Sequence, residues 1–412
     1  MSERVYFDWN ASAPLRDEAR AAFLRALDAR NASSVHAEGR TARGLIEAAR
    51  DQVAQAFGAQ AQDVIFTSGA TEANMLALTP ALEGSGIKGW RDRLFVSGVE
   101  HPSVLCGGRF PDPQVERLAV ESAGLVDLEA LRVAIGRAER PLVSVMLANN
   151  ETGVVQPVAA IAAIVHGAGG LLHVDAAQGP GRLDCSIAAL GADLMTISSH
   201  KLGGPQGAGA LIWHNTGLGD IHIAEPLIRG GGQERSRRAG TENVAAIAGF
   251  GAAAEAAATA VAAEAAHMGR LRGELEAGLK AATPGVVIFS AGVERLPNTT
   301  LFAVPGMKAE TAVIAFDLNG IAVSSGAACS SGKVAASHVL AAMGVEPELA
   351  RGAVRVSLGP ASCENEVERF LETWIMLAGS LVKERQGARR VRAARSTIHR
   401  RESSATATLA TP

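Results

Sequence analysis

The most informative segment of the chain is Leu194-Met195-Thr196-Ile197-Ser198-Ser199-His200-Lys201-Leu202-Gly203-Gly204-Pro205. An apolar run typical of a strand ends in two serines, a histidine and a lysine, and glycines and a proline then turn the chain. Only six of the 39 basic residues are lysines, which suggests that an amine is needed here. One hypothesis is that Lys201 holds an aldehyde cofactor as a Schiff base. The alternative is a surface lysine at the end of a strand.

Apolar segments of strand length recur on both sides of this segment, with helical segments between most of them. They comprise residues 64–67, 94–97, 142–147, 171–174, 194–197 and 210–213. Continuous apolar strands that alternate with helices are typical of a parallel sheet covered on both faces. We therefore predict an α/β fold in which residues 15–260 form a large domain around this sheet.

The remaining residues predict a smaller α+β domain and a tail. We expect a long alanine-rich helix near 245–282, then strands near 286–289, 300–304 and 353–357 and helices near 310–319 and 364–381. We assign residues 261–384 to this domain, together with residues 1–14. Arginines dominate the start of residues 385–412, which predicts a basic, disordered tail, with a docking arm as the alternative.

Composition excludes several classes of function. The chain has 412 residues, 48% of them hydrophobic and 20% charged, and a formal net charge of −3. This is a globular balance, and it lacks the basic surplus of proteins that bind nucleic acid or membranes. We expect neither a signal peptide nor a membrane span, because the alanine-rich helix contains Glu255 and Glu264. The four cysteines lack CxxC spacing, which argues against an intrinsic metal site and fits the cytoplasm.

Polar clusters follow five of the predicted strands, at residues 67–71, 100–101, 149–151, 175–178 and 198–201. Ligands bind at the carboxyl ends of parallel strands, so we expect these clusters to meet at one edge of the sheet. The small-residue turn at Ala70 and Thr71 opens a helix, whose N–H groups and positive end suit a phosphate. Ser198 and His200 could add phosphate contacts, although small residues also cap ordinary helices.

Asp175 ends a buried strand, where a carboxylate is costly unless it is paired. The protonated ring nitrogen of pyridoxal phosphate is a suitable partner, and the pair makes the ring an electron sink. Gln178 can then reach the ring oxygen, and His101 can stack on the ring and transfer protons. Asn150 offers an amide to the ring oxygen and to a substrate carboxylate. The alternatives are a capping aspartate, a structural histidine and a simple turn.

Three further positions are candidates for substrate chemistry. Cys329 lies within Ser324–Gly332, a segment of small residues. It has no core to fill there, so we interpret it as reactive. Arg355 can hold a substrate carboxylate through two parallel hydrogen bonds, and the alternative is a strand arginine that only forms a salt bridge. Thr241 follows a glycine-rich segment, 230–235, that we expect to approach a partner subunit, unless Thr241 only caps the next helix.

Together these motifs resemble the cysteine desulfurases of the iron–sulfur assembly type, which are pyridoxal-phosphate enzymes with the fold of class V aminotransferases. The resemblance extends from Tyr6 to about Leu381. It rests on residues 31–40, 67–74, 100–104, 149–156, 173–178, 198–201, 230–234, 240–243 and 324–332. It implies aminotransferase fold type I, with a mainly parallel seven-stranded sheet in the large domain.

The resemblance also implies a role for each candidate. Lys201 would be the Schiff-base lysine, His101 the residue stacked on the ring, and Cys329 the acceptor of the substrate's sulfur. Arg355, beside Asn150, would bind the carboxylate of L-cysteine. The cofactor would be held by Ala70, Thr71, His101, Asn150, Asp175, Gln178, Ser198, His200, Lys201 and, from the neighbouring subunit of a homodimer, Thr241.

The implied activity converts L-cysteine to L-alanine and leaves a persulfide on Cys329, whose sulfur passes to an iron–sulfur scaffold or another acceptor protein. A single cysteine cannot hold an iron–sulfur cluster, so a transient cluster at Cys329 would need ligands from a partner. The segment Asn10-Ala11-Ser12 and Ala32 depart from the family's pattern, and we expect no part for either in the chemistry. The basic tail is also unlike the family's usual ending and leaves the acceptor open.

Two other functions remain as alternatives. Another pyridoxal-phosphate aminotransferase or lyase of the same fold would need no reactive cysteine. A scaffold or regulatory protein would have kept the fold and lost the chemistry. The joint presence of Lys201, His101, Asp175 and Cys329 argues against the second alternative.

Overall fold

A computed structural model describes residues 4–83, 89–214, 222–325 and 337–379. Cys329 and the predicted tail at 385–412 lie outside these residues. The main sheet has the order β2-β9-β8-β7-β6-β4-β5. In that order the strands are Val64–Thr67, Gly209–Trp213, Leu194–Ser198, Leu171–Asp175, Pro141–Met146, Arg93–Ser97 and Val115–Leu118. β9 is antiparallel to both of its neighbours, and the other pairs are parallel. The predicted α/β fold with a mainly parallel, seven-stranded sheet is confirmed.

The apolar pattern did not reveal β5, which lies at the edge of the sheet beside β4. Only Leu118 of its four residues is buried. An edge strand has one neighbouring strand and one open side, so Glu116 and Arg117 are tolerated within it. The strand therefore lacks the continuous apolar run by which the other six were recognised.

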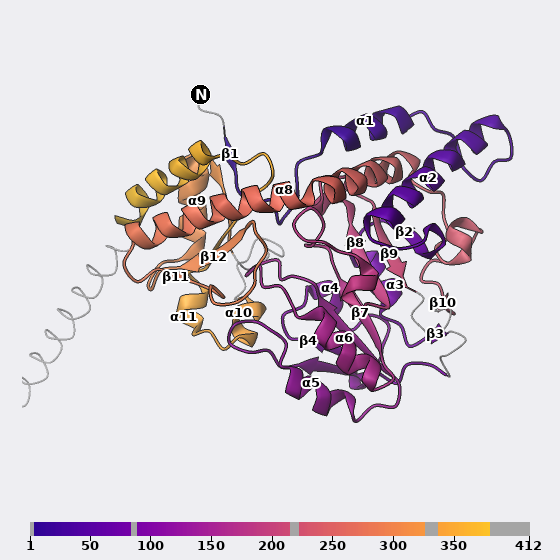
Figure 1. Ribbon diagram of the computed structural model, residues 1–412, viewed down its shortest axis with the longest axis horizontal. Helices are drawn as coiled ribbons and strands as arrows, with labels where there is room; N and C mark the ends of the chain where they lie inside the picture. Colours follow the sequence, from indigo (N-terminus) through magenta and orange to yellow (C-terminus); the bar gives the residue numbers. More distant parts are fainter. Residues whose placement is uncertain (1–3, 84–88, 215–221, 326–336, 380–412) are drawn as a thin grey trace, which may run out of the picture.

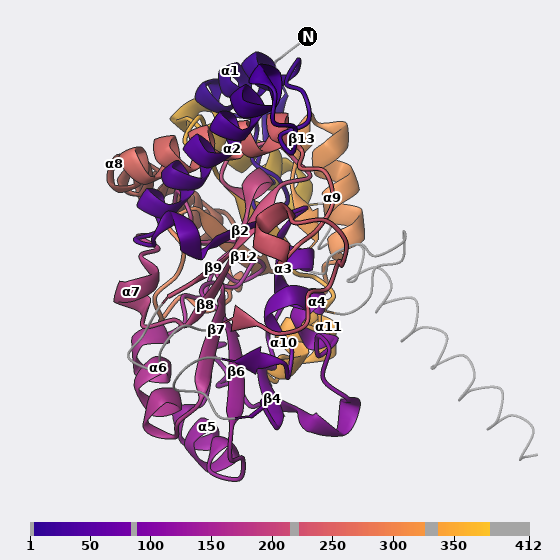
Figure 2. The same ribbon diagram turned by 90° about the vertical axis from the view of Figure 1, so that its right-hand side faces the viewer.

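Helices cover both faces of the main sheet, as Figure 2 shows. α3 (Ala70–Ala77) and α4 (Pro102–Leu105) pack with Leu171 of β7 on one face. On the other face, α5 (Leu128–Ile135), α6 (Val158–Gly167) and α7 (Ile187–Leu190) pack with Leu172 and Val174. Side chains alternate along a strand, so Asp175 lies on the α3 side, like Leu171.

A second, four-stranded antiparallel sheet has the order β11-β12-β15-β14. Its strands are Val287–Ile288, Thr299–Ala303, Val354–Ser357 and Ser324–Ser325. β1 (Val5–Tyr6) pairs in parallel with β13 (Ile321–Ala322). This part has its own core, in which Phe316 of α9 (Ala309–Leu318) stacks on Phe370 of a helical segment at 364–379. The short helices α10 (His338–Ala342) and α11 (Pro347–Ala350) belong to this C-terminal part of the chain.

The long helix α8 (Val244–Ala282) runs past both sheets (Figure 1). It packs on α1 (Asp17–Ala26) and α2 (Ala37–Ala56), and further along it Leu275 enters the core of the second part. Small residues permit the close approach of α8 to α2, since a Cβ on Gly251 of α8 would lie only 2.6 Å from Cα of Ala49 in α2. By length and composition α8 could cross a membrane, but 56% of its most apolar stretch is buried inside the protein.

Smaller elements complete the described chain. β3 (Leu82–Glu83) and β10 (His222–Ile223) form an antiparallel pair. Single turns of 3-10 helix occur at Ala61–Asp63, Asp112–Gln114, Ser199–Lys201 and Gln233–Ser236. The turn at Ser199–Lys201 directly follows β8, so the strand ends where Lys201 leaves the sheet.

A buried ion pair joins the start of the main sheet to the glycine-rich segment at 230–235. The guanidinium of Arg50 donates to both carboxylate oxygens of Glu234 at 2.7 Å, and Glu234 also accepts from the backbone N–H of Phe66 on β2 at 2.9 Å. The side chains of Arg50 and Glu234 are 4% and 2% exposed. Glu234 has a φ of 45°, a left-handed conformation that costs free energy in a residue other than glycine, so tertiary contacts must hold it.

We expect Glu234→Gln to lower the free energy of unfolding by about 3–5 kcal/mol, because it removes the buried counter-charge of Arg50 and leaves only the half-exposed carboxylate of Glu47, 3.1 Å from Nε. Urea unfolding monitored by circular dichroism measures the change. Glu129→Gln is the matched control, because Glu129 forms an ion pair with Arg132 at the surface. The side chains of Arg132 and Glu129 are 57% and 76% exposed. A Glu234→Gln protein as resistant to urea as the control would contradict the structural role of this pair.

Candidate active site

A cavity of about 790 Å³ lies at the carboxyl end of the main sheet. Its size is typical of a site for a small molecule or cofactor. Of the predicted site residues, it is lined by Ala70, Thr71, His101, Asn150, Asp175, Gln178, Ser198, His200, Lys201 and Arg355. These residues come from the ends of several strands and from β15 of the second sheet, so the structure brings together positions that are far apart in the chain.

Lys201 is held at the wall of this cavity. Its Nζ donates to the backbone carbonyl of Asn10, which lies in the segment between β1 and α1. Burial, followed by the positive charges of Arg355 and Arg182, lowers the pKa of Lys201 to about 7. A large fraction of the amine is therefore neutral at physiological pH, as a nucleophilic or basic lysine requires.

Asp175 projects from the end of β7 and is 5% exposed. One carboxylate oxygen accepts from the side-chain amide of Asn74 at 2.8 Å, and the other accepts from the N–H of Ala177 at 3.0 Å. Both partners are neutral donors, and no ion pair of Asp175 is found among the described residues. The carboxylate thus keeps the capacity to pair with a positively charged group in the cavity.

The N-terminus of α3 forms another wall of the cavity. Gly69 stands before the helix and gives no side-chain cap, and a Cβ added to it would meet nothing within 4 Å. The first-turn N–H groups at Ala70 and Thr71 therefore face open space that suits an anion. Glu72 in the same turn is paired with Arg238 at 2.8 Å, so its charge is balanced.

His200 and His101 are both held as neutral imidazoles. Burial and the neighbouring charge of Lys201 lower the pKa of His200 to about 4, and its Nδ1 lies 3.2 Å from Oγ of Ser12. Burial also lowers the pKa of His101, whose Nδ1 lies 2.8 Å from Oγ of Ser103. His200 is therefore a hydrogen-bonding group, not a cation, beside the anion-binding end of α3.

Arg355 enters the cavity from the second sheet. Its two terminal nitrogens donate to the backbone carbonyl of Asn150 at 2.8 Å and to the carboxylate of Asp8 at 2.7 Å. The residue is 6% exposed, and its Nε is buried without a hydrogen-bond partner. Arg355 therefore forms a salt bridge with Asp8 while its guanidinium lies at the cavity wall, and its role in holding a substrate carboxylate stays a prediction.

Two of the predicted residues are not among the described residues that line this cavity. Thr241 is exposed and absent from its lining, and Asn243 caps α8 in place of Thr241 by accepting from the N–H of Ala246. Cys329 lies outside the described residues. Ser324 and Ser325, which precede its segment, line the cavity. Ser337, which follows the segment, donates at 2.6 Å to the carboxylate of Glu151, the neighbour in sequence of the cavity residue Asn150.

Two residues that sequence reasoning overlooked have contacts at the centre of the site. Asn10, for which we expected no part in the chemistry, lines the cavity and accepts from both Lys201 and Gln178, so that expectation is wrong. Asn74 fixes the carboxylate of Asp175. The amide of Asn74, between the apolar residues Ala73 and Met75 of α3, is a local signal for this position. The carbonyl of Asn10 meets a residue 191 positions away, which no local pattern can reveal.

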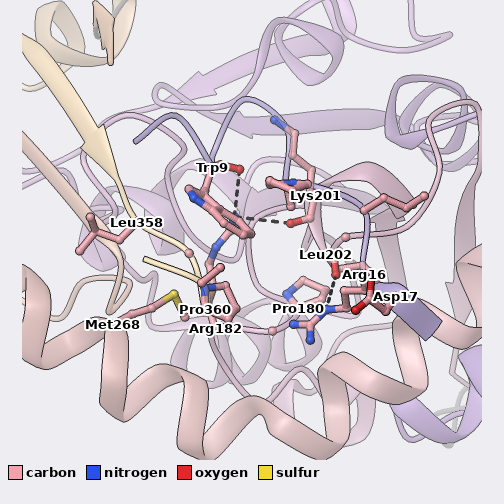
Figure 3. Close-up of a pocket in the computed structure, with 17 residues that line it drawn as sticks. Trp9, Arg16, Asp17, Pro180, Arg182, Lys201, Leu202, Met268, Leu358 and Pro360 are labelled. Carbon is pink, nitrogen blue, oxygen red and sulfur yellow. Dashed lines mark hydrogen bonds between the residues drawn. The ribbon is translucent and has the colours of Figure 1, made fainter. Parts of the chain in front are cut away.

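A second cavity, of about 230 Å³, lies on another side of Lys201 (Figure 3). It is lined by Trp9, Arg16, Pro180, Arg182, Met268 and Pro360, among others. Its lining lacks Asp175 and the N-terminus of α3. It therefore has neither the acid nor the phosphate-binding end that the larger cavity offers, and we place the active site in the larger one.

The residues of the larger cavity fit pyridoxal phosphate. The free end of α3, Ser198 and His200 suit the phosphate, and the buried Asp175 lacks a cationic partner of the kind that a protonated ring nitrogen supplies. Lys201 presents a partly neutral amine at the same wall. An anion-binding end, a buried acid and a reactive amine are the three features by which proteins hold this cofactor.

Comparisons with known proteins agree with this geometry. The model of the family described as aminotransferase class-V matches residues 5–370. A cysteine desulfurase of Cereibacter sphaeroides is 40% identical over 377 residues, which cover 90% of this chain and 94% of that protein. An IscS-like cysteine desulfurase of Mycobacterium tuberculosis is 36% identical over 93% of this chain and 98% of its own.

Solved structures give the same result. A NifS-like protein of Rickettsia africae superposes with a TM-score of 0.82 at 37% identity, and the match covers 92% of this chain and all of that one. The resemblance that the motifs indicated is thereby confirmed over most of the chain. The individual roles of the site residues rest on the geometry described above.

Proposed function

Because this chain belongs to the class-V aminotransferase family, whose cysteine desulfurases depend on pyridoxal phosphate, we propose that it is a cysteine desulfurase. It converts L-cysteine to L-alanine and transfers the sulfur to Cys329 as a persulfide. The observation that supports this most strongly is the convergence of ten predicted residues from distant parts of the chain on one cavity. Chance placement of a lysine, an acid and an anion-binding helix end would not produce that convergence.

Each residue of the cavity has a task that its contacts support. The N–H groups at Ala70 and Thr71, with Ser198 and His200, bind the phosphate. Asp175, oriented by Asn74, holds the proton at the ring nitrogen, and His101 covers one face of the ring. Gln178 donates to the ring oxygen beside Asn150. Arg355 exchanges its contact with Asp8 for the carboxylate of L-cysteine, which it holds by charge-assisted hydrogen bonds.

The cofactor supplies a positively charged ring that accepts electrons from the α-carbon of the substrate. Lys201 would hold the cofactor through its amine and, as a base, would move the proton at the substrate's α-carbon through Nζ. Cys329 Sγ acts as a thiolate: it forms a bond to the substrate sulfur while the carbon–sulfur bond of the substrate breaks. The carbon skeleton leaves as L-alanine, and the persulfide remains on Cys329.

The direct test is incubation of the protein with pyridoxal phosphate, L-cysteine and a thiol reductant. We expect alanine and sulfide in equal amounts. An aminotransferase would instead need a keto acid as a second substrate, and another lyase would release a product other than alanine. Formation of no alanine by protein that contains the cofactor would refute the proposal and leave the alternative of an aminotransferase or lyase of the same fold.

The low pKa of Lys201 gives a prediction that needs no cofactor. Acetic anhydride reacts only with neutral amines, so we expect labelling of Lys201 in the cofactor-free protein to rise with pH and reach half its maximum near pH 7. For an ordinary lysine, labelling reaches half its maximum at about pH 10.4. Arg355→Met removes a positive charge that lowers this pKa and should move the midpoint to higher pH. Mass spectrometry of the Lys201 peptide measures both, and a midpoint above about pH 9 in the unmodified protein would contradict the assignment.

The proposal extends to partners and organisation. Thr241 reaches the phosphate of the neighbouring subunit in a homodimer with shared sites, which its exposed position outside its own cavity supports. The persulfide passes to an iron–sulfur scaffold or another acceptor protein in the cytoplasm. Two of the four hydrophobic clusters support a large domain at 15–260 and a small domain at 1–14 and 261–384, because each lies within one of them. A further cluster, with Met146 and Leu301, spans both, and the active site lies where β15 of the small domain meets the large one.

A further inference from the structure

A buried guanidinium lines the smaller of the two cavities beside Lys201. Arg182 lies four residues after Gln178 and is 5% exposed. Its Nη1 donates to the backbone carbonyl and to the side-chain oxygen of Gln178, both at 2.9 Å. Its Nη2 donates over longer distances to the carbonyls of Trp9 at 3.3 Å and Lys201 at 3.5 Å, as the dashed lines in Figure 3 show. All four acceptors are neutral oxygens.

Such a charge is costly to bury. Within the part of the chain that the structure describes, no ion pair joins Arg182 to a carboxylate. Burial, followed by the positive charge of Arg355, lowers its pKa to about 10, so the side chain remains protonated at neutral pH. A buried cation is normally paired with an anion, so the retention of Arg182 among neutral acceptors needs a reason other than an ion pair.

The contact with Gln178 settles which way the amide points. A guanidinium has only hydrogen-bond donors, so the Gln178 atom that faces Arg182 must be the oxygen. The NH2 group must then point the other way, where it donates to the carbonyl of Asn10 at 3.0 Å. That carbonyl also accepts from Nζ of Lys201, so the donor end of Gln178 lies at the wall of the larger cavity. The carbonyl of Asn10 and the guanidinium of Arg182 thus hold the two ends of the amide, and Arg182 is the contact of the two that a side-chain substitution can remove.

We propose that Arg182 is a positioning residue of the cofactor site, which keeps the donor end of the Gln178 amide directed at the ring oxygen of pyridoxal phosphate. The inference rests on the proposed function, in which Gln178 meets that oxygen. The ring oxygen carries negative charge and accepts hydrogen bonds, so an amide turned by half a rotation would place oxygen against oxygen. Arg182 touches neither the cofactor nor the substrate and acts only through Gln178.

The test measures the dissociation constant of pyridoxal phosphate from the cofactor-free protein by its visible absorption. We expect Arg182→Met and Gln178→Ala each to weaken binding by about tenfold, as the loss of one hydrogen bond to a charged group does. Because both changes remove the same contact, the double variant should bind about as weakly as the weaker single variant. Effects that multiply in the double variant, or wild-type affinity in Arg182→Met, would overturn the proposal.

A second measurement separates positioning from general structural support. A donor to the ring oxygen stabilises its anionic form, so its loss raises the pKa of that oxygen. We expect the pH midpoint of the visible absorption to move upward in Arg182→Met and Gln178→Ala alike. A merely structural role would lower the melting temperature and leave the midpoint unchanged. If Arg182→Met fails to fold, Arg182→Gln is the second variant, because its neutral amide enforces no orientation on Gln178. An absorption midpoint that is unchanged in Arg182→Gln would also overturn the proposal.

Arg16→Met is the matched control, because it removes a guanidinium from the same second cavity. Arg16 is paired with Glu264 and makes no hydrogen bond to Gln178. We expect its absorption midpoint to equal that of the wild type, and a shift as large as in Arg182→Met would overturn the proposal. Wild-type protein that binds no pyridoxal phosphate would instead refute the proposed function, so the two failures are distinguishable.

Discussion

Lys201→Ala is expected to reduce alanine formation from L-cysteine by a factor on the order of 10⁴, because it removes both the attachment of the cofactor and the proton-transfer group. The variant should also lose the visible absorption of the wild-type protein. Burial disfavours the charged amine of Lys201, so its removal should not lower the melting temperature. Alanine analysis, the absorption spectrum and a thermal melt of the same preparation measure the three effects.

The control for this change is Lys280→Ala. Lys280 is an exposed lysine of α8, far along the chain from the cavity lining, and its loss should alter neither colour nor turnover. Retention of both the visible absorption and desulfuration in Lys201→Ala would show that another amine holds the cofactor. In that case the site would have to be sought outside the cavity described here.

Cys329→Ser is expected to have the second largest effect. Turnover of L-cysteine in the presence of a reductant should fall by a factor on the order of 10³ or more, since a hydroxyl replaces the sulfur nucleophile of the reaction. The visible absorption should persist, because Lys201 and Asp175 are intact. Mass spectrometry after brief exposure to L-cysteine should find one added sulfur on the peptide that contains Cys329 in the wild type and none in the variant.

The matched controls are the other cysteines. Cys106 and Cys363 are exposed, and Cys185 is buried; burial raises the pKa of Cys185, so its thiol stays protonated and unreactive. Cys106→Ser and Cys363→Ser should keep full activity and the added sulfur on Cys329. Sulfur found on Cys106 or Cys363, with Cys329 unmodified, would move the acceptor role to that residue. Full turnover in Cys329→Ser would favour an aminotransferase or another lyase.

Much of the fold and site can be predicted from local patterns. Six of the seven main strands are continuous apolar runs, because both faces of a parallel sheet are buried. The clusters at Thr67–Thr71, Asp175–Gln178 and Ser198–Lys201 follow such runs directly, and the carboxyl ends of parallel strands must meet at one edge. The predicted positions of Lys201, Asp175 and His101 in one cavity follow from that rule alone.

Other parts depend on contacts that no local pattern contains. β5 has no apolar run because three of its four side chains are not buried, whereas β2, at the opposite edge of the sheet, is buried throughout. The carbonyl of Asn10 receives Lys201, and Arg355 meets Asp8 and Asn150, only when segments separated by between 191 and 347 residues come together. A backbone carbonyl is identical in every residue, so its use as a partner cannot be recognised from residue type.

The amino-acid sequence by itself determined the α/β class, the parallel sheet and the set of reactive side chains, because strand periodicity and residue chemistry are local properties. The folded chain decided which carbonyl receives the lysine amine, how far burial lowers the pKa of that amine, and which end of the Gln178 amide faces the cavity. Those three depend on desolvation and on the position of charges such as Arg182 and Arg355. Such quantities exist only after distant segments have packed.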